Sequence, residues 1–144
     1  MKIEKMTQKH LDAVHKIEQE CFSHPWSLES LESEMKNENS LFLAAVDDGE
    51  VIGYIGMSIV IDEGYIFNVA VCESSRQRGV ATALINELVT YAKKNNFSFI
   101  TLEVRESNMP ARSLYSKFGF IKAGERKDYY SAPRENAILM TKFF

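Results

Sequence analysis

The sequence predicts a single α/β domain over residues 1–144, in which helices flank a mixed, largely antiparallel central sheet. Two kinds of pattern indicate this fold class: segments with apolar residues at helical spacing, and shorter apolar runs of strand length that are bounded by turn residues. Hydrophobic residues make up 45% of the 144 residues and charged residues 26%, with no biased stretch. A chain of this length and composition is expected to fold around one core.

The N-terminal third is expected to contain one strand and two helices. A short strand spans Lys2–Met6, and a loop through His24–Trp26 separates the two helices. Thr7 caps the first helix and Ser27 the second, because their side-chain oxygens can accept from backbone N–H groups of the first turn. The first helix carries apolar residues at helical spacing, namely Leu11, Val14, Ile17 and Cys21.

The middle of the chain is predicted to form an antiparallel meander. Strands at Leu41–Val46 and Val51–Val60 are joined by Asp47–Glu50, whose Asp-Asp-Gly-Glu sequence is typical of a hairpin turn. Gly64 marks the next turn, and Tyr65–Val71 forms the third strand.

The remaining elements alternate between helix and strand. A helix over Arg78–Asn95 precedes a buried strand over Phe97–Val104. A short helix then starts at Pro110, which the first helical turn tolerates, and ends at Gly119. Strands near Phe120–Asp128 and Asn136–Phe143 complete the sheet. The apolar stripe of the longer helix includes Val80, Leu84, Leu88 and Tyr91.

Charge and cysteine content disfavour several classes of protein. The net charge of −3 disfavours direct binding to nucleic acid, which calls for a basic excess. Cys21 and Cys72 form no C-x-x-C pair, and His10, His15 and His24 lack metal-ligand spacing. The N-terminus lacks the apolar stretch of a signal peptide, and no apolar run is long enough to span a bilayer. We therefore expect a cytoplasmic protein that needs no metal and contacts no membrane.

A strand that runs into a basic, glycine-containing turn is the strongest functional signal. A helix N-terminus leaves backbone N–H groups unpaired and carries partial positive charge, so it can bind phosphate oxygens. Glycine lets the phosphate approach the backbone. For Arg76 and Arg78 the alternative is a solvated pair of surface charges. The residues predicted to hold a diphosphate are Val69, Ala70, Val71, Arg76, Gln77, Arg78, Gly79, Val80, Ala81 and Thr82.

The spacing of Arg76, Gly79 and Ala81 resembles the R/Q-x-x-G-x-G/A signature of the GCN5-related N-acetyltransferase (GNAT) family. The resemblance implies a GNAT-type domain whose sheet is splayed open between the strand ending at Val71 and the strand carrying Glu103, with acetyl-coenzyme A (acetyl-CoA) in the opening. Four further segments resemble one branch, the bacterial enzymes that acetylate the N-terminal alanine of a small-subunit ribosomal protein: Cys21–Ser27, Leu102–Asn108, Ala111–Tyr115 with Gly119–Phe120, and Arg126–Tyr130.

Glu103 is the candidate general base. Acetyl transfer from a thioester to an amine needs an uncharged nitrogen, and an α-amino group with a reference pKa of about 7.7 to 8.0 is mostly protonated near neutral pH. Glu103 places a charge inside an apolar strand, on the face opposite Leu102 and Val104. It could accept the proton directly or through water. The alternative is a solvated glutamate on an exposed sheet face.

Tyr115 is the candidate acid, because a phenol can protonate the thiolate that leaves. The resemblance implies this role: Asn108, Ala111 and Tyr115 match an N-x-x-A-x-x-x-Y pattern in which the family's tyrosine lies beside the sulfur. By spacing alone, Tyr115 packs its helix against the sheet, as aromatic residues commonly do. Asn108 either binds the pantetheine arm or caps the helix that follows it.

The carbonyl and the acceptor require further groups. A bulged strand edge near Asn68–Val71 can direct a backbone N–H at the thioester oxygen. Apolar walls and phenolic hydrogen bonds could hold a peptide terminus, although packing is the competing role for such residues. The candidates for acceptor binding are Pro25, Trp26, Tyr129 and Tyr130.

Together these residues, with the resemblance, predict an acetyl-CoA-dependent enzyme that acetylates the N-terminal α-amino group of a protein by direct amine attack. The acceptor expected from the resemblance is the N-terminal alanine of a small-subunit ribosomal protein. Three alternatives stay open: an acetyltransferase for lysine side chains or small amines, a non-catalytic CoA-binding sensor, and a structural interaction domain.

Overall fold

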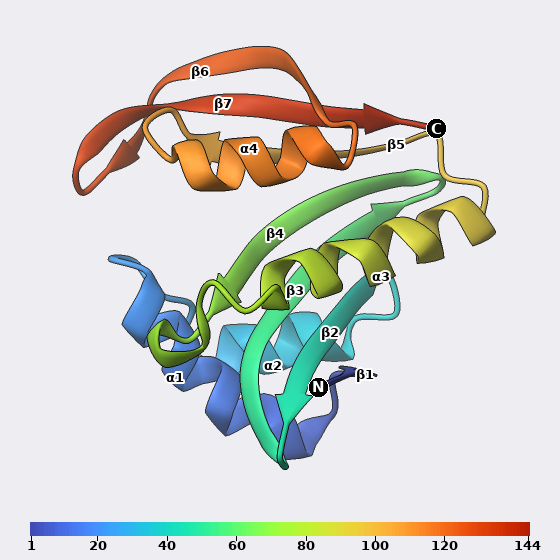
Figure 1. Cartoon of the computed structure of the whole chain (residues 1–144), viewed down its shortest axis with the longest axis vertical. Helices are drawn as coiled ribbons and strands as arrows, with labels where there is room; N and C mark the ends of the chain where they lie inside the picture. Colours follow the sequence, from blue (N-terminus) through green and yellow to red (C-terminus); the bar gives the residue numbers. More distant parts are fainter.

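The computed structural model describes all 144 residues and contains one seven-stranded sheet with helices on both faces (Figure 1). The strand order is β1-β2-β3-β4-β5-β7-β6, and every neighbouring pair is antiparallel except β4 and β5. The predicted α/β class with a mixed, largely antiparallel sheet is confirmed. The elements are β1 (Lys2–Lys5), α1 (Leu11–Cys21), α2 (Leu28–Lys36), β2 (Ser40–Asp47), β3 (Glu50–Val60), β4 (Glu63–Val71), α3 (Val80–Lys94), β5 (Phe99–Arg105), α4 (Met109–Lys117), β6 (Ile121–Ser131) and β7 (Arg134–Phe143).

Each face of the sheet has its own hydrophobic core. Residues of α3 and α4, including Leu84, pack with Ile55 in the larger core, whereas α1 and α2 bury Leu31 with Tyr54 in the smaller one. Ile55 and Tyr54 are neighbours in β3, and successive strand residues point to opposite faces. The helices are therefore divided between the two faces, with α1 and α2 on one and α3 and α4 on the other.

The sheet splays between its two central strands. β4 and β5 pair in parallel only from Glu63 to Tyr65, opposite Phe99 to Thr101. Beyond these residues the strands diverge, and β5, β6, β7 and α4 form a layer that turns away from β4 (Figure 1). A bulge at Phe67 also bends β4, since Met57 pairs with Ile66 while Gly56 pairs with Asn68. The splayed sheet implied by the sequence resemblance is present.

Three helix starts follow from short polar residues or glycine. The Ser27 hydroxyl accepts a hydrogen bond from the Ser30 backbone N–H at 3.1 Å, and the Asn108 side chain accepts one from the Ala111 N–H at 3.2 Å. Gly79, with φ at +76°, precedes α3. None of the helices combines the length and apolar character that a membrane crossing requires.

Several predicted details of the fold are wrong. Thr7 was predicted to cap the first helix, but a 3-10 turn, Gln8–His10, separates it from α1. Gly64 lies inside β4 and not at the turn; a Cβ there would meet the Met57 sulfur at 2.6 Å, so close packing explains the glycine. Tyr91 was predicted to belong to the apolar stripe of α3, but it is 36% exposed, although its ring contacts Phe97.

Candidate active site

A cleft with a volume of about 1020 Å³ opens where β4 and β5 diverge. Its walls come from the α1–α2 loop, β4, β5, α4, the end of β6 and the β6–β7 turn. Leu102 and Val104 line it and belong to the α3 core, whereas Glu103 lines it from the opposite side of the same strand. The cleft therefore connects the two faces of the sheet.

A smaller groove of about 190 Å³ adjoins the start of α3. No side chain caps this helix, so backbone N–H groups of its first turn remain available to a ligand. The strand end that precedes the groove and the glycine at φ +76° leave the main chain open to an anion. Of the residues predicted for a diphosphate, those that line the groove are Val71, Arg76, Gln77, Gly79, Val80, Ala81 and Thr82.

Three of the predicted diphosphate residues lie elsewhere. Arg78 forms an ion pair with Asp47 of β2 at 2.9 Å, which is the surface-charge alternative considered for it. Val69 lines the large cleft, and Ala70 is buried in the α1–α2 core. Ser75 lines the groove and was missed by sequence reasoning.

Arg76 belongs to the groove but is tied back to the protein. Its Nε donates to the Val71 carbonyl at 3.2 Å, and its Nη2 lies 3.4 Å from the Cys21 sulfur. Arg76 therefore braces the end of β4 against α1, with its guanidinium next to the groove.

If acetyl-CoA is the donor, as the sequence resemblance implies, replacing Gly79 by Ala is expected to raise its KM about tenfold, because an added methyl group would stand where a phosphate approaches the backbone. A Cβ at Gly79 meets no protein atom within 4 Å, so the variant should fold, with a loss of about 1 kcal/mol from the positive φ. Gly49, at φ +81° and equally unobstructed, offers the matched control. Steady-state kinetics and thermal melting should show the same loss of stability for both variants and an altered KM for Gly79→Ala alone. Unchanged cofactor KM would contradict the diphosphate role.

Glu103 faces the cleft on the α1–α2 side of the sheet. Its Oε1 lies 3.2 Å from Nε of Arg126 on β6, and its side chain is 28% exposed. The carboxylate is therefore neither buried nor isolated in solvent, and it is accessible to a proton donor in the cleft. The alternation predicted for this strand is confirmed, since Ile100, Leu102 and Val104 are buried while Thr101 and Glu103 are not.

Tyr115 reaches the cleft from α4 on the other face of the sheet. Tyr115 is 8% exposed and packs against Phe120. It therefore contributes to the core, which is the packing role considered as the alternative for this residue. It also lines the cleft. Burial, with a smaller effect from Tyr130, raises the pKa of Tyr115 to about 12. The phenol therefore keeps its proton at physiological pH.

Asn108 has the capping role that the sequence left open. Its side-chain oxygen is engaged by the Ala111 N–H, and the residue also borders the cleft. Its position is thus compatible with contact to a ligand through the amide nitrogen.

Aromatic residues form the wall of the cleft near Glu103. Trp26 packs edge-on against Phe67 at the β4 bulge, and the rings of Tyr129 and Tyr130 also meet edge to face, at a centroid distance of 5.1 Å. All four line the cleft. Pro25, by contrast, is exposed and lies outside it, because the loop turns its ring toward solvent before Trp26 returns to the protein.

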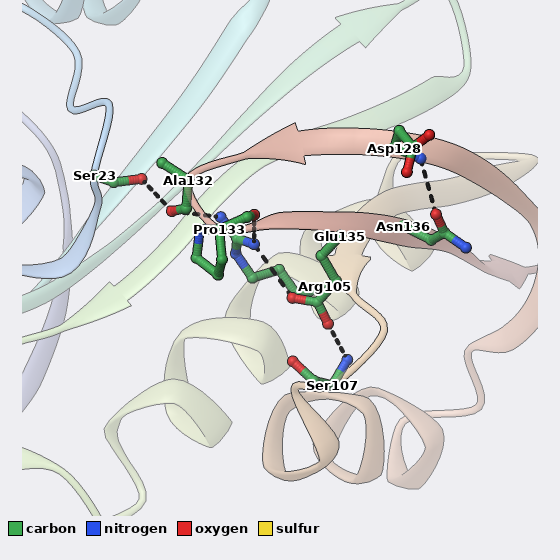
Figure 2. Close-up of polar contacts among 8 residues, drawn as sticks. All are labelled: Ser23, Arg105, Ser107, Asp128, Ala132, Pro133, Glu135 and Asn136. Carbon is green, nitrogen blue, oxygen red and sulfur yellow. Dashed lines mark hydrogen bonds and ion pairs between the residues drawn. The ribbon is translucent and has the colours of Figure 1, made fainter.

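Two hydrogen bonds connect opposite sides of this wall. The Ser23 hydroxyl donates to the Ala132 carbonyl at 3.1 Å, which Figure 2 shows, and the Ser131 hydroxyl lies 3.2 Å from Nε2 of His24. The α1–α2 loop and the β6–β7 turn therefore meet over the cleft. Sequence reasoning missed these bonds because they join residues more than 100 positions apart.

Glu18 stabilises the part of the aromatic wall that Trp26 forms, and sequence reasoning missed it as well. This fully buried carboxylate of α1 accepts hydrogen bonds from the Trp26 N–H, from Nδ2 of Asn68 and from the Tyr54 hydroxyl. It thereby links the α1–α2 loop to the β4 bulge. A signal existed, because Glu18 follows Leu11 by seven residues and so occupies the apolar stripe of the helix.

Replacing Glu18 by Ala is expected to destabilise the fold by about 3 kcal/mol, because it leaves three donors without an acceptor. Urea denaturation monitored by circular dichroism measures the free energy of unfolding. Glu20 is the matched control: it lies on the exposed side of the same helix and accepts one hydrogen bond, from the Glu73 N–H. Equal stability losses in Glu18→Ala and Glu20→Ala would contradict the role of Glu18.

The splayed sheet, the groove at a helix N-terminus and a cleft lined by both a carboxylate and a phenol are compatible with an acyltransferase. Residues 11–120 match the Acetyltransferase (GNAT) family, and the chain therefore belongs to this family. A Haemophilus influenzae relative named ribosomal protein bS18-alanine N-acetyltransferase is 35% identical, over 90% of this chain and 89% of its own length.

Solved structures show the same fold. The crystal structure of the ribosomal-protein-S18-alanine N-acetyltransferase from Escherichia coli has a TM-score of 0.92 and 31% identity, and the similarity covers 99% of this chain and 92% of that one. Arabidopsis thaliana NAA60 in complex with acetyl-CoA has a TM-score of 0.89 at 24% identity, with 99% of each chain covered.

Proposed function

We propose that this protein transfers the acetyl group of acetyl-CoA to the N-terminal α-amino group of a protein, with the N-terminal alanine of a small-subunit ribosomal protein as acceptor. The single observation that carries the proposal is the cleft through the splayed sheet, with Glu103 on one face and Tyr115 on the other. Such a site would act in the cytoplasm, where ribosomal proteins are found, and would use residues 1–144 as one domain.

The donor side is the face of α3 and α4. The groove at the start of α3 fits a diphosphate, because uncapped N–H groups, Arg76 and the open main chain at Gly79 converge there. Asn108 and Tyr115 border the cleft on this same face. Acetyl-CoA supplies the thioester whose acetyl group is transferred.

The chemistry follows from the groups that line the cleft. Glu103 removes a proton from the acceptor ammonium, directly or through water, and the neutral nitrogen attacks the carbonyl carbon. Beyond Tyr65 the edge of β4 lacks a strand partner on the β5 side, so an N–H near the Phe67 bulge can donate to the carbonyl oxygen. As the carbon–sulfur bond breaks, Tyr115 gives its proton to the departing sulfur, and the nitrogen, now bonded to the acetyl carbon, loses its second proton through water to solvent. Tyr115 then regains a proton from solvent and Glu103 returns its own to solvent, so the amide, the free thiol of CoA and one net proton are the products.

The acceptor side supports a chain terminus. The Ser23–Ala132 and Ser131–His24 bonds bridge the cleft above the aromatic wall, so a polypeptide enters most easily by its end. The names of the sequence relative and of the Escherichia coli structure, which specify alanine of ribosomal protein S18, support the same acceptor class.

Isotopically labelled acetyl-CoA and two matched peptides test the proposal. One peptide begins with a free alanine, and the other has a blocked terminus and an internal lysine. We expect mass spectrometry to place the label on the alanine nitrogen alone.

Other outcomes redirect the assignment. Label on lysine would replace the proposal with side-chain or small-amine acetylation. Tight binding of acetyl-CoA without transfer to any of a broad set of acceptors would indicate a CoA-binding sensor, and absence of binding would leave a structural role.

A further inference from the structure

We propose that the Arg105–Glu135 pair positions the acceptor-binding wall and thereby sets the KM for the acceptor; this inference rests on the proposed function. Arg105 ends β5 and Glu135 is the second residue of β7, so the pair lies beside the β6–β7 turn (Figure 2). Arg105 and the turn residues Ala132 and Pro133 line the cleft. Neither residue takes part in the proton transfers described above.

The Arg105 guanidinium holds the turn through several contacts at once. Nη1 donates to the Pro133 carbonyl at 2.8 Å and to Oε1 of Glu135 at 3.2 Å, and Nη2 donates to the Ala132 carbonyl at 3.2 Å. The guanidinium carbon also lies 4.3 Å from the centre of the Tyr130 ring. One side chain therefore fixes both the path of the turn and the plane of an aromatic wall residue.

Glu135 extends the same connection to the donor side. Its Oε2 accepts a hydrogen bond of 2.6 Å from the backbone N–H of Ser107, which directly precedes the Asn108 cap of α4. Hydrogen bonds from Ser107 and, to a lesser extent, from Arg105 hold the pKa of Glu135 below its usual range. The carboxylate therefore remains charged and paired under physiological conditions.

The pair consequently joins three segments that border the cleft. It binds the β6–β7 turn to the β5–α4 loop, and the Ala132 carbonyl that Arg105 contacts also accepts from Ser23 of the α1–α2 loop (Figure 2). Losing the pair would release the turn that orients Tyr130 while leaving Glu103 and Tyr115 on their own elements. The expected consequence is weaker acceptor binding with little change in the chemical step.

A second ion pair, which joins β7 to β6, provides a matched control. Arg134 Nη2 lies 2.8 Å from Asp128 Oδ2, but these side chains are 76% and 38% exposed and neither residue lines the cleft. The Arg105 and Glu135 side chains are 26% and 16% exposed. The two pairs thus share chemistry and neighbourhood, but of the four residues only Arg105 lines the cleft.

The experiment measures kinetics and peptide binding for Arg105→Lys, Glu135→Gln and Arg134→Gln. Lysine keeps the charge but lacks the planar fork that reaches two carbonyls and a carboxylate together. We expect Arg105→Lys to raise the KM for the alanine peptide about tenfold, and Glu135→Gln about fivefold. The acceptor kcat and the KM for acetyl-CoA should stay within about twofold, and Arg134→Gln should behave as wild type.

Peptide affinity measured by calorimetry in the presence of coenzyme A separates this inference from the proposed function. If wild type binds the peptide without transfer while Arg105→Lys binds it more weakly, the proposed function fails and the positioning role stands. The positioning role is overturned if Arg105→Lys keeps the wild-type peptide affinity and KM. It is also overturned if Arg134→Gln raises the acceptor KM as much as Arg105→Lys does, or if Arg105→Lys lowers kcat and leaves KM unchanged. If the wild-type protein neither binds nor acetylates the peptide, both the proposed function and the positioning role are overturned.

Discussion

Replacing Glu103 by Gln is expected to lower kcat for acetyl transfer about hundredfold near pH 7, because the acceptor ammonium then loses its general base. The loss should shrink as the pH is raised toward about 9, since an α-amino group with a pKa of about 8 becomes neutral there without help. Transfer to the alanine peptide, followed from about pH 6 to 9 for both proteins, gives the two profiles. The amide retains the size of the carboxylate, and the ion pair with a half-exposed Arg126 contributes little to stability.

Glu125→Gln supplies the control for this measurement. Glu125 lies on β6, carries a surface ion pair with Lys122 and does not line the cleft. Its kinetics should match wild type at every pH. A Glu103→Gln protein with the wild-type rate at pH 7 would remove the base assignment, and a loss that stays constant up to pH 9 would assign Glu103 to acceptor binding instead.

Local sequence patterns predicted the elements and the faces of the strands well. Alternation in β5 placed Glu103 opposite Leu102 and Val104, as the structure has it. Asn108 before Met109-Pro110 predicted a helix start, which the side-chain bond to the Ala111 N–H confirms. These features depend on residues within a few positions of one another, and short-range geometry decides them.

Contacts across the sheet could not be predicted in this way. Arg78 looked available to a phosphate, but the hairpin turn brings Asp47 to it from 31 positions away. Glu18 of α1 accepts hydrogen bonds from Tyr54 of β3 and Asn68 of β4 because the fold brings these two strands next to α1. A single sequence gives the residue types for such clusters but not the superposition of elements that assembles them.

The same limit applies to the acceptor wall. Trp26, Tyr129 and Tyr130 were identified as candidates and line the cleft, whereas Pro25, adjacent to Trp26, faces solvent. The α1–α2 loop was predicted as a loop without a conformation, so the side chains that turn inward could not be distinguished. The bonds that close the cleft depend on the β6–β7 turn meeting this loop, which only the complete fold determines.

Replacing Tyr115 by Phe is expected to lower kcat about hundredfold to thousandfold while the KM values for both substrates change little, because the hydroxyl acts on the departing sulfur and not in ground-state binding. The ring remains packed against Phe120, so the melting temperature should be preserved. Single-turnover transfer to the alanine peptide measures the chemical step without interference from product release.

The pH dependence distinguishes this acid from the base on the opposite face. Burial raises the pKa of Tyr115 to about 12, above its usual value of 10, so the group stays protonated until the pH approaches 12. Wild-type kcat should therefore rise as the acceptor amine is deprotonated and show no alkaline fall up to about pH 10. Tyr115→Phe should keep the shape of that profile at a lower rate, whereas Glu103→Gln should change the shape. Tyr91→Phe, on the solvent side of α3, controls for loss of a hydroxyl. An undiminished rate in Tyr115→Phe would mean that the sulfur leaves with a proton from water, and Tyr115 would keep only its packing role.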